Sequence, residues 1–420
     1  RCVRAQRRCG KRFGKVSSAR RIPLTCSPTY LAARTMELTS VSPEQRGANS
    51  QRISPSRLQV ARLRRGLTKA DLAHLIGVSP STLSKWEAEG PPASRVASLL
   101  ENLVSTLDFP PAFFTADEVD IPSLEHTFFR AGSRATQRQK LAAVSSGVNA
   151  TILLKWLRSH FSYSSPDIPD LTGMAPAEAA RYVRSIWALG DSPIPNSVQL
   201  AESKGIAVIG LPPAAFAVDA FSLWEDDQPF IFLARRRTPE DTRFDLAHEL
   251  GHLLLHSMSA PDTPTDREDE ANKFATEFLI PIDVIHANLR LHPSLDDILR
   301  LKSKLKVSAM AALMAVFNAD KLSDRQFRQY LGILSSRGFQ TSEPGSDLQY
   351  ERSRVFDLVF SPDGGQSARS IADATHIPVQ DLHFLTLNAA ANAIPSPEST
   401  HPSASSSPSS HRPNLRIVKA

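Results

Sequence analysis

The apolar positions of this chain follow a helical period in most segments and a strand pattern in one region. Residues 58–114 and 281–386 have the pattern of mainly helical segments. Short apolar runs at 205–210, 220–224 and 230–233 predict strands, and the last two are spaced as a hairpin. The expected fold class is therefore multidomain: an all-α domain, an α+β domain with a small sheet, and a helical C-terminal region.

Residues 244–255 are apolar around most of a helix circumference, which predicts a helix buried in a core. His248 and His252 are four residues apart, so both imidazoles leave the same face and can share one metal ion. Glu249 projects beside them. Burial of such a cluster without partners is costly and metal coordination relieves the cost, so we favour a metal site over a plain amphipathic helix.

This spacing predicts a metallopeptidase site in which His248 and His252 are ligands and Glu249 is the catalytic base. Zinc is the expected cofactor, and manganese is the alternative. Zinc makes a water molecule acidic enough to lose a proton near neutral pH, and Glu249 is placed to take that proton. A zinc site of this class needs a third protein ligand.

The third ligand is expected in a second helix at 268–279. Glu268 and Asn272 are one turn apart, so Glu268 can reach the metal while Asn272 accepts a hydrogen bond from a ligand histidine. Glu270 is the rival ligand, and a solvated acidic helix start is the alternative without a metal. His256 follows the motif, and we interpret it as structural or as a partner of a ligand histidine.

Residues 58–114 carry the cap and turn signals of a helix-turn-helix domain. Thr68 and Asp71 predict a capping box for the second helix, Gly77 lies in the turn, and Ser79 caps the third helix. A plain helical bundle is the alternative interpretation.

The outward face of the third helix carries short polar residues and suits the major groove of DNA. Arg62, Arg64 and Arg65 are expected to hold the phosphate backbone. The candidate DNA-binding residues are Lys69, Ser79, Ser81, Thr82, Ser84 and Lys85.

The net charge of +6 is concentrated at the start of the chain. Ten of the 49 Lys and Arg residues lie in residues 1–35, which contain no Asp or Glu, so the other 39 stand against 43 acids. All three cysteines, Cys2, Cys9 and Cys26, lie there too, which excludes disulfides and cysteine-bound zinc elsewhere. We favour translation from Met36; a transit peptide and a basic DNA-binding arm are the alternatives.

No apolar run is long enough to span a bilayer, so we expect a soluble, cytoplasmic protein without membrane contact. Residues 141–161 predict one long helix that carries the DNA-binding domain away from the rest or mediates dimerisation. The expected segments are a basic disordered or mistranslated head (1–53), a helix-turn-helix domain (54–115), a helical connector (116–190), a metallopeptidase domain (191–290), a helical C-terminal region (291–390) and a disordered Ser/Pro-rich tail (391–420).

Two stretches resemble known families. The sequence RRGLTKADLAHLIGVSPSTLSKWEAEG resembles the Xre/Cro-like helix-turn-helix domain. The motifs DAFSLW, PFIFL, RFDLAHELGHLLLH and EDEANKFATEFLIP, within 219–281, resemble the ImmA/IrrE metallo-endopeptidases. That resemblance implies zinc ligands at His248, His252 and Glu268 and a base at Glu249. Ala234 and Ile280 stand where the family usually has Asn and Met.

The sequence leaves two functions open. In the first, a homodimer binds an inverted-repeat operator in double-stranded DNA, and its peptidase domain cleaves a repressor or antitoxin partner. An exposed edge of the predicted hairpin would bind the extended substrate. In the second, a transcription factor or antitoxin uses a non-catalytic peptidase-like domain to sense a metal, a peptide or a small ligand.

Overall fold

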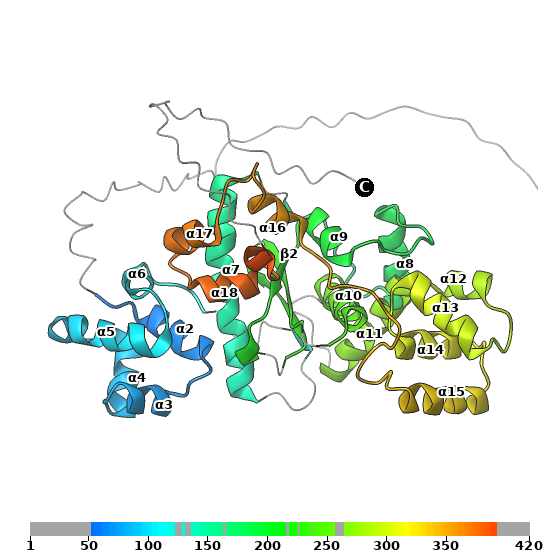
Figure 1. Ribbon diagram of the computed structural model, residues 1–420, viewed down its shortest axis with the longest axis horizontal. Helices are drawn as coiled ribbons and strands as arrows, with labels where there is room; N and C mark the ends of the chain where they lie inside the picture. Colours follow the sequence, from blue (N-terminus) through cyan, green and yellow to red (C-terminus); the bar gives the residue numbers. More distant parts are fainter. Residues whose placement is uncertain are drawn as a thin grey trace, which may run out of the picture. The chain divides into compact units, whose positions relative to one another are not determined.

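The computed structural model describes residues 52–121, 128–130, 136–162, 165–215, 218–225, 227–235, 237–256 and 264–392 (Figure 1). The expectations about Met36, the three cysteines and the tail from residue 393 lie outside these residues. Within them, none of the helices combines the length and the apolar composition that crossing a membrane requires.

The N-terminal part is helical, as predicted. Its helices are α2 (Pro55–Arg64), α3 (Lys69–Leu75), α4 (Pro80–Glu89), α5 (Val96–Leu107) and α6 (Pro111–Thr115), with a 3-10 turn at Ala93–Arg95. The predicted capping box of Thr68 and Asp71 starts α3, and Ser79 caps α4. Gly77 has φ +70° in the turn between these helices, a conformation that suits glycine. Leu58, Leu83 and Trp86 belong to the core that holds α2 and α4 together.

A four-stranded sheet follows, in the order β1 (Phe128–Arg130), β3 (Ala220–Glu225), β4 (Gln228–Leu233), β2 (Ala207–Gly210). The predicted hairpin is β3–β4, which pair antiparallel from Ala220↔Leu233 to Glu225↔Gln228; β2 joins β4 in parallel. The connector is mainly helical, as expected, but it also contains strand β1, which was not predicted. Three residues are too few to show a period, and the pairing partner of β1 is distant in sequence.

Alternate residues of the sheet face two different cores. Val208, Ala220 and Ile231 pack with apolar residues of α10 (Pro239–Leu255) and α11 (Pro264–Leu279). Phe221 and Phe232 face the other way and stack with ring centroids 4.3 Å apart. Helices α7 (Gln137–His160), α17 (Ala368–Thr375) and α18 (Val379–Leu385) belong to that second core, on the opposite face from α10 and α11 (Figure 1).

Helix α7 confirms the predicted long helix but not its expected role. Val148 is buried in the core of the N-terminal helices, whereas Ala150, Leu153 and Leu157 are buried against the sheet. The apolar positions that were expected to separate the domains or to form a dimer are therefore filled by this chain's own residues.

Two of the remaining helices precede β2, and the others follow α11 and include those of the expected helical C-terminal region. They are α8 (Pro176–Ile186), α9 (Ser197–Ser203), α12 (Ile282–Asn288), α13 (Leu295–Leu305), α14 (Ala309–Asn318), α15 (Asp324–Ser336), α16 (Arg354–Val359) and α19 (Ala389–Asn392). Helix α19 extends two residues into the segment that was expected to be a disordered tail.

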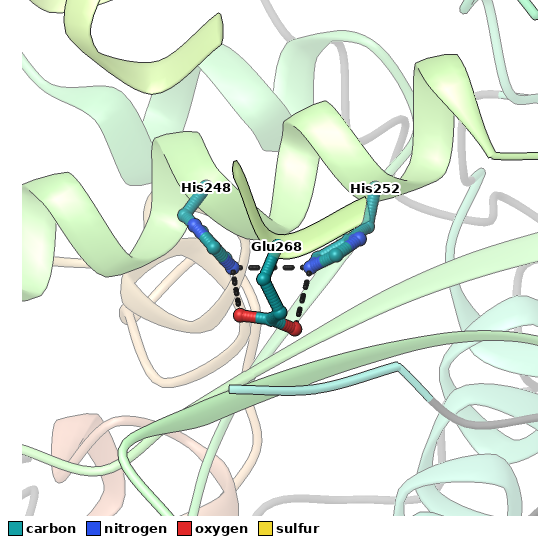
Figure 2. Close-up of side chains that lie close together, drawn as sticks. All are labelled: His248, His252 and Glu268. Carbon is teal, nitrogen blue, oxygen red and sulfur yellow. Dashed lines mark hydrogen bonds and ion pairs between the residues drawn. The ribbon is translucent and has the colours of Figure 1, made fainter. Parts of the chain in front are cut away.

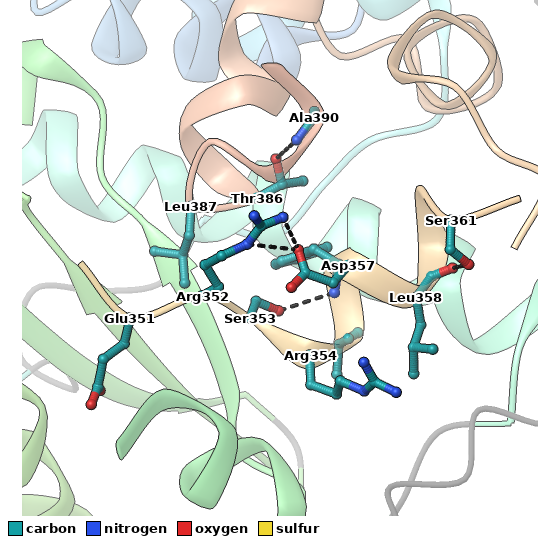
Figure 3. Close-up of polar contacts among 12 residues, drawn as sticks. Glu351, Arg352, Ser353, Arg354, Asp357, Leu358, Ser361, Thr386, Leu387 and Ala390 are labelled. Atoms are coloured by element: carbon teal, nitrogen blue, oxygen red, sulfur yellow. Dashed lines mark hydrogen bonds and ion pairs between the residues drawn. The ribbon is translucent and has the colours of Figure 1, made fainter. Parts of the chain in front are cut away.

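Two carboxylates, Glu202 and Glu351, fix the segment before α16 to the rest of the molecule. Figure 3 shows this segment, with Glu351 and Ser353 before the helix and Arg352 paired with Asp357 of the helix. Glu202 on α9 accepts hydrogen bonds from the Ser353 hydroxyl and from the first backbone N–H groups of α16. Glu351 in turn accepts from the hydroxyl and backbone N–H of Ser197, at the start of α9, and from Arg243 of α10. Glu202 of α9 thus caps the start of α16, and Glu351, which precedes α16, caps the start of α9.

Candidate metal centre and DNA-binding face

Helix α10 carries the histidine motif through the core. Thr238 caps it and Pro239 occupies its first turn, both typical of a helix start. Gly251 allows close packing against α11, because a Cβ there would lie 3.1 Å from the Phe274 ring and 3.3 Å from the Cα of Ala271. This close approach brings the start of α11 to the face of α10 that bears the histidines.

His248, His252 and Glu268 converge at one point (Figure 2). The Nε2 atoms of the two histidines are 3.0 Å apart. The Glu268 carboxylate lies 3.3 Å from Nε2 of His248 and 3.4 Å from Nε2 of His252. Both histidines are buried, and the Glu268 side chain is 41% exposed, so the centre opens to solvent on the glutamate side.

The outer nitrogens of both histidines have hydrogen-bond partners. Nδ1 of His248 lies 3.0 Å from Oδ1 of Asn272. Nδ1 of His252 lies 2.8 Å from Nδ1 of His256, whose Nε2 is 3.0 Å from a carboxylate oxygen of Glu270. Glu270 therefore contacts His256 and not the point of convergence, so this geometry does not support it as the rival ligand.

These contacts determine which nitrogens carry protons. The Glu270 carboxylate can only accept, so His256 donates from Nε2 and accepts at Nδ1 from His252. The Oδ1 of Asn272 likewise accepts from Nδ1 of His248. In neutral imidazoles both Nε2 atoms then carry lone pairs, and these face each other beside a carboxylate. Such a set of acceptors is the donor set of a divalent cation.

Titration at the centre follows the same logic. Burial raises the pKa of the Glu268 carboxyl, but in the alternative state in which His248 and His252 are protonated, their hydrogen bonds and charges lower it to about 2. Burial and the neighbouring His252 hold the pKa of His256 below its ordinary value, against the opposing effect of Glu270. An ionised Glu268 and a neutral His256 fit the proton arrangement described above.

Glu249 points toward the sheet. Its side chain is fully buried, and the hydroxyl of Ser222 on β3 donates a hydrogen bond of 2.7 Å to its Oε2. The sequence reasoning did not single out Ser222. The available signal was a lone hydroxyl in the apolar strand DAFSLW, at a position that alternation places on the α10 side of the sheet.

The hairpin edge that was expected to be exposed is partly covered. Strand β1 pairs antiparallel with β3 from Phe128↔Ser222 to Arg130↔Ala220. The expectation of an open edge failed because a distant segment of the same chain satisfies those backbone groups, as exposed edges usually require.

The candidate DNA-binding residues gather on α4 and the start of α3. Ser79, Ser81 and Lys85 are exposed, as is Lys69, whereas Thr82 and Ser84 are half-buried. The Ser79 hydroxyl lies 2.8 Å from the hydroxyls of both Ser81 and Thr82. Lys85 is 4.0 Å from Glu89 and 70% exposed, so its ammonium group is accessible to a phosphate.

Arg62 and Arg64 lie on α2, and Arg65 follows it. The contacts of these arginines correct the expectation that they hold the DNA backbone. Arg62 is buried and bound to Glu87 through two nitrogens, at 2.5 and 2.9 Å. Arg64 and Arg65 each lie 3.1 Å from the same carboxylate oxygen of Asp381 on α18. The sequence pattern shows that these residues are basic. It does not show that they form ion pairs with acidic residues elsewhere in the fold.

Comparisons with known families agree with both parts of this picture. A family model described as helix-turn-helix matches residues 58–104, and one described as IrrE N-terminal-like domain matches residues 201–317. A comparison with curated proteins finds no match. The chain therefore joins an Xre-like helix-turn-helix domain, of a DNA-binding regulator, to a peptidase-like domain of the ImmA/IrrE type.

Proposed function

We propose that this chain is an operator-binding regulator whose second domain is a zinc-dependent endopeptidase. His248, His252 and Glu268 would hold the zinc ion, with manganese as the alternative metal. The observation that carries the proposal is the convergence of the Nε2 atoms of two buried histidines and one carboxylate at a single point. Without a cation these acceptors repel one another, so the residues present fit a divalent metal.

A zinc ion bound there would supply a Lewis acid that lowers the pKa of water and polarises the substrate carbonyl. Glu249 takes the proton of the attacking water on its carboxylate and passes it to the nitrogen of the departing amine. Ser222 holds one oxygen of that carboxylate and so fixes its orientation. Asn272 and His256 hold the two ligand histidines in the tautomer that presents Nε2.

The DNA-binding part of the proposal assigns the operator face to Lys69, Ser79, Ser81, Thr82, Ser84 and Lys85. One such domain reads a short half-site, so a homodimer on an inverted repeat fits best. The substrate would be a partner protein in the same regulatory circuit, a repressor or an antitoxin.

The test begins with metal content. Protein starting at Met36, purified without a histidine tag, is expected to bind about one zinc ion per chain. His248→Ala should bind none. Absence of metal in the unaltered protein, even after incubation with zinc, would remove the catalytic proposal and leave a DNA-binding protein with a sensing domain.

Glu249→Gln tests the catalytic step. The variant should keep zinc and operator affinity, because Glu249 belongs neither to the proposed ligand set nor to the proposed DNA-binding face, and it should lose hydrolysis of candidate repressors and antitoxins encoded near this gene. The measurement is product formation by mass spectrometry, with the unaltered chain as the positive control. Cleavage by the variant at the unaltered rate would show that Glu249 is not the base.

A further inference from the structure

Strand β1 brings a piece of the connector to the wall of the candidate centre. It lies between α6, the last helix of the N-terminal part, and α7. Its three residues pair antiparallel with β3, as Phe128↔Ser222, Phe129↔Phe221 and Arg130↔Ala220. On this side of the sheet, β1 is the outermost strand among the described residues.

The covered part of β3 is the part nearest to Glu249. Ser222, opposite Phe128, is the residue whose hydroxyl holds the Glu249 carboxylate. Strand β1 also lies close to α10 itself. In Figure 2 it is the short cyan segment below Glu268. The connector backbone therefore runs along the strand edge that flanks the converging side chains.

An extended peptide substrate would pair with this same edge. An extended chain adds to a sheet through main-chain hydrogen bonds, and one strand edge can pair with only one such chain at a time. Strand β1 already has the extended conformation, and it pairs antiparallel with β3.

We propose that β1 is an internal occupant of the substrate-binding edge of β3, which an extended peptide from a partner protein displaces when it binds. The inference rests on the proposed peptidase function. The strand is short, so few hydrogen bonds oppose its displacement. Its attachment to the same chain nevertheless gives it an effective concentration on the order of millimolar, which excludes weakly bound peptides.

The test uses the chain's own sequence as the probe. A fluorescein-labelled peptide of residues 124–134 is titrated with the full-length protein in the presence of a chelator, and binding is followed by anisotropy. The unaltered protein should bind weakly. The double variant Phe128→Pro, Phe129→Pro should bind at least about tenfold more tightly, because successive N–H groups of a strand point to opposite sides and proline removes both.

The matched control is Phe128→Ala, Phe129→Ala, which keeps both N–H groups and should bind the peptide as weakly as the unaltered protein. Equal affinity of the proline variant, the alanine variant and the unaltered protein would overturn the proposal. So would tight binding by the unaltered protein.

A reversible crosslink gives a second measurement if the proline variant folds poorly. Arg130→Cys with Ala220→Cys joins opposite residues of β1 and β3, in a chain whose Cys2, Cys9 and Cys26 are replaced by serine. The test is made with Phe128→Pro and without it. The oxidised protein should exclude the peptide in both backgrounds, and reduction should restore binding only with the proline; binding to the oxidised form would overturn the proposal.

These results are independent of the metal. If the unaltered chain binds no zinc but the proline variant gains peptide affinity, the peptidase proposal fails and the occupied edge remains. If zinc binds and peptide affinity never changes, only the present inference fails.

Discussion

Metal binding at the candidate centre depends on which ring nitrogens of its histidines carry protons, and neighbouring residues determine this. The motif predicted His248, His252 and Glu249, and the one-turn spacing from Glu268 predicted Asn272 beside a histidine. The contacts of Ser222 and Glu270 could not be predicted, because each joins side chains of two different elements whose packing the motif does not encode. The sequence left open whether His256 is structural or supports a ligand histidine. Its contact with Nδ1 of His252 favours the supporting role.

The pair His256–Glu270 leads to a prediction about metal affinity. Glu270→Gln weakens the acceptor that holds His256, and with it the tautomer of His252, so zinc affinity should fall roughly tenfold or more. Competition with a chromogenic chelator measures it. Asp269→Asn, which removes only the exposed pair with Lys273, is the control and should leave affinity unchanged. An equal loss in both variants would argue for a general effect of charge on α11.

Lys85 provides the residue-scale test of the DNA-binding face. Its ammonium is exposed and only distantly paired with Glu89. Lys85→Ala should weaken affinity for an operator selected from random DNA by on the order of 1 kcal/mol and lower the salt slope by about 1. Lys155→Ala on α7 is the control. An unchanged salt slope for Lys85→Ala would place this lysine outside the interface.

Elements were predictable where their own residues specify them. Capping residues such as Thr68 and Ser79 predicted the starts of α3 and α4, and apolar runs predicted β2, β3 and β4. Strand β1 was not predictable because it exists through its pairing with β3. The hydrogen bonds that join α9 and α16 could not be predicted for the same reason, because Glu202 and Glu351 each cap a helix that begins far away in sequence.

The α9–α16 joint should make stability depend on pH. Burial raises the pKa of Glu202 to about 7, against hydrogen bonds from Ser353 and two backbone N–H groups that lower it. The folded protein thus holds this proton more tightly than the unfolded chain does, and stability should fall as pH rises from about 4.5 to 7, by up to roughly 3 kcal/mol.

Urea unfolding at pH 5 and pH 8 measures this effect. Glu202→Gln stays neutral and should show a smaller difference between the two pH values than the unaltered chain. The exposed Glu101→Gln serves as the control. A pH difference of the same size in Glu202→Gln would assign the titration to another group.

At the scale of the whole molecule, a buried charge cluster joins the two functional parts. Asp381 on α18 receives Arg64 and Arg65 from the helix-turn-helix side, and Asp381 and Arg64 have almost no exposed side-chain surface. Burial lowers the pKa of Arg64 to about 10 even though Asp381 raises it. The cluster is therefore held at a desolvation cost that only the complete set of partners offsets.

Loss of Asp381 should consequently be severe. Asp381→Ala leaves two guanidinium groups without their common acceptor, and the free energy of unfolding should fall by about 3–5 kcal/mol. Thermal and urea unfolding measure the loss, and the exposed Asp373→Ala on α17 should unfold like the unaltered chain. A loss below about 1 kcal/mol would mean that water reaches the arginines and replaces the carboxylate.

Helix α7 has a consequence for how this chain can be divided. Its apolar residues fill the core of the DNA-binding part at Val148 and the core under the sheet at Leu153 and Leu157. An expressed fragment that ends before Gln137 or begins after His160 would expose one of these cores to water. Recombination during evolution meets the same obstacle. Neither part can be exchanged for a homologous domain unless α7 is transferred with it and the new α7 also packs into the core of the part that stays.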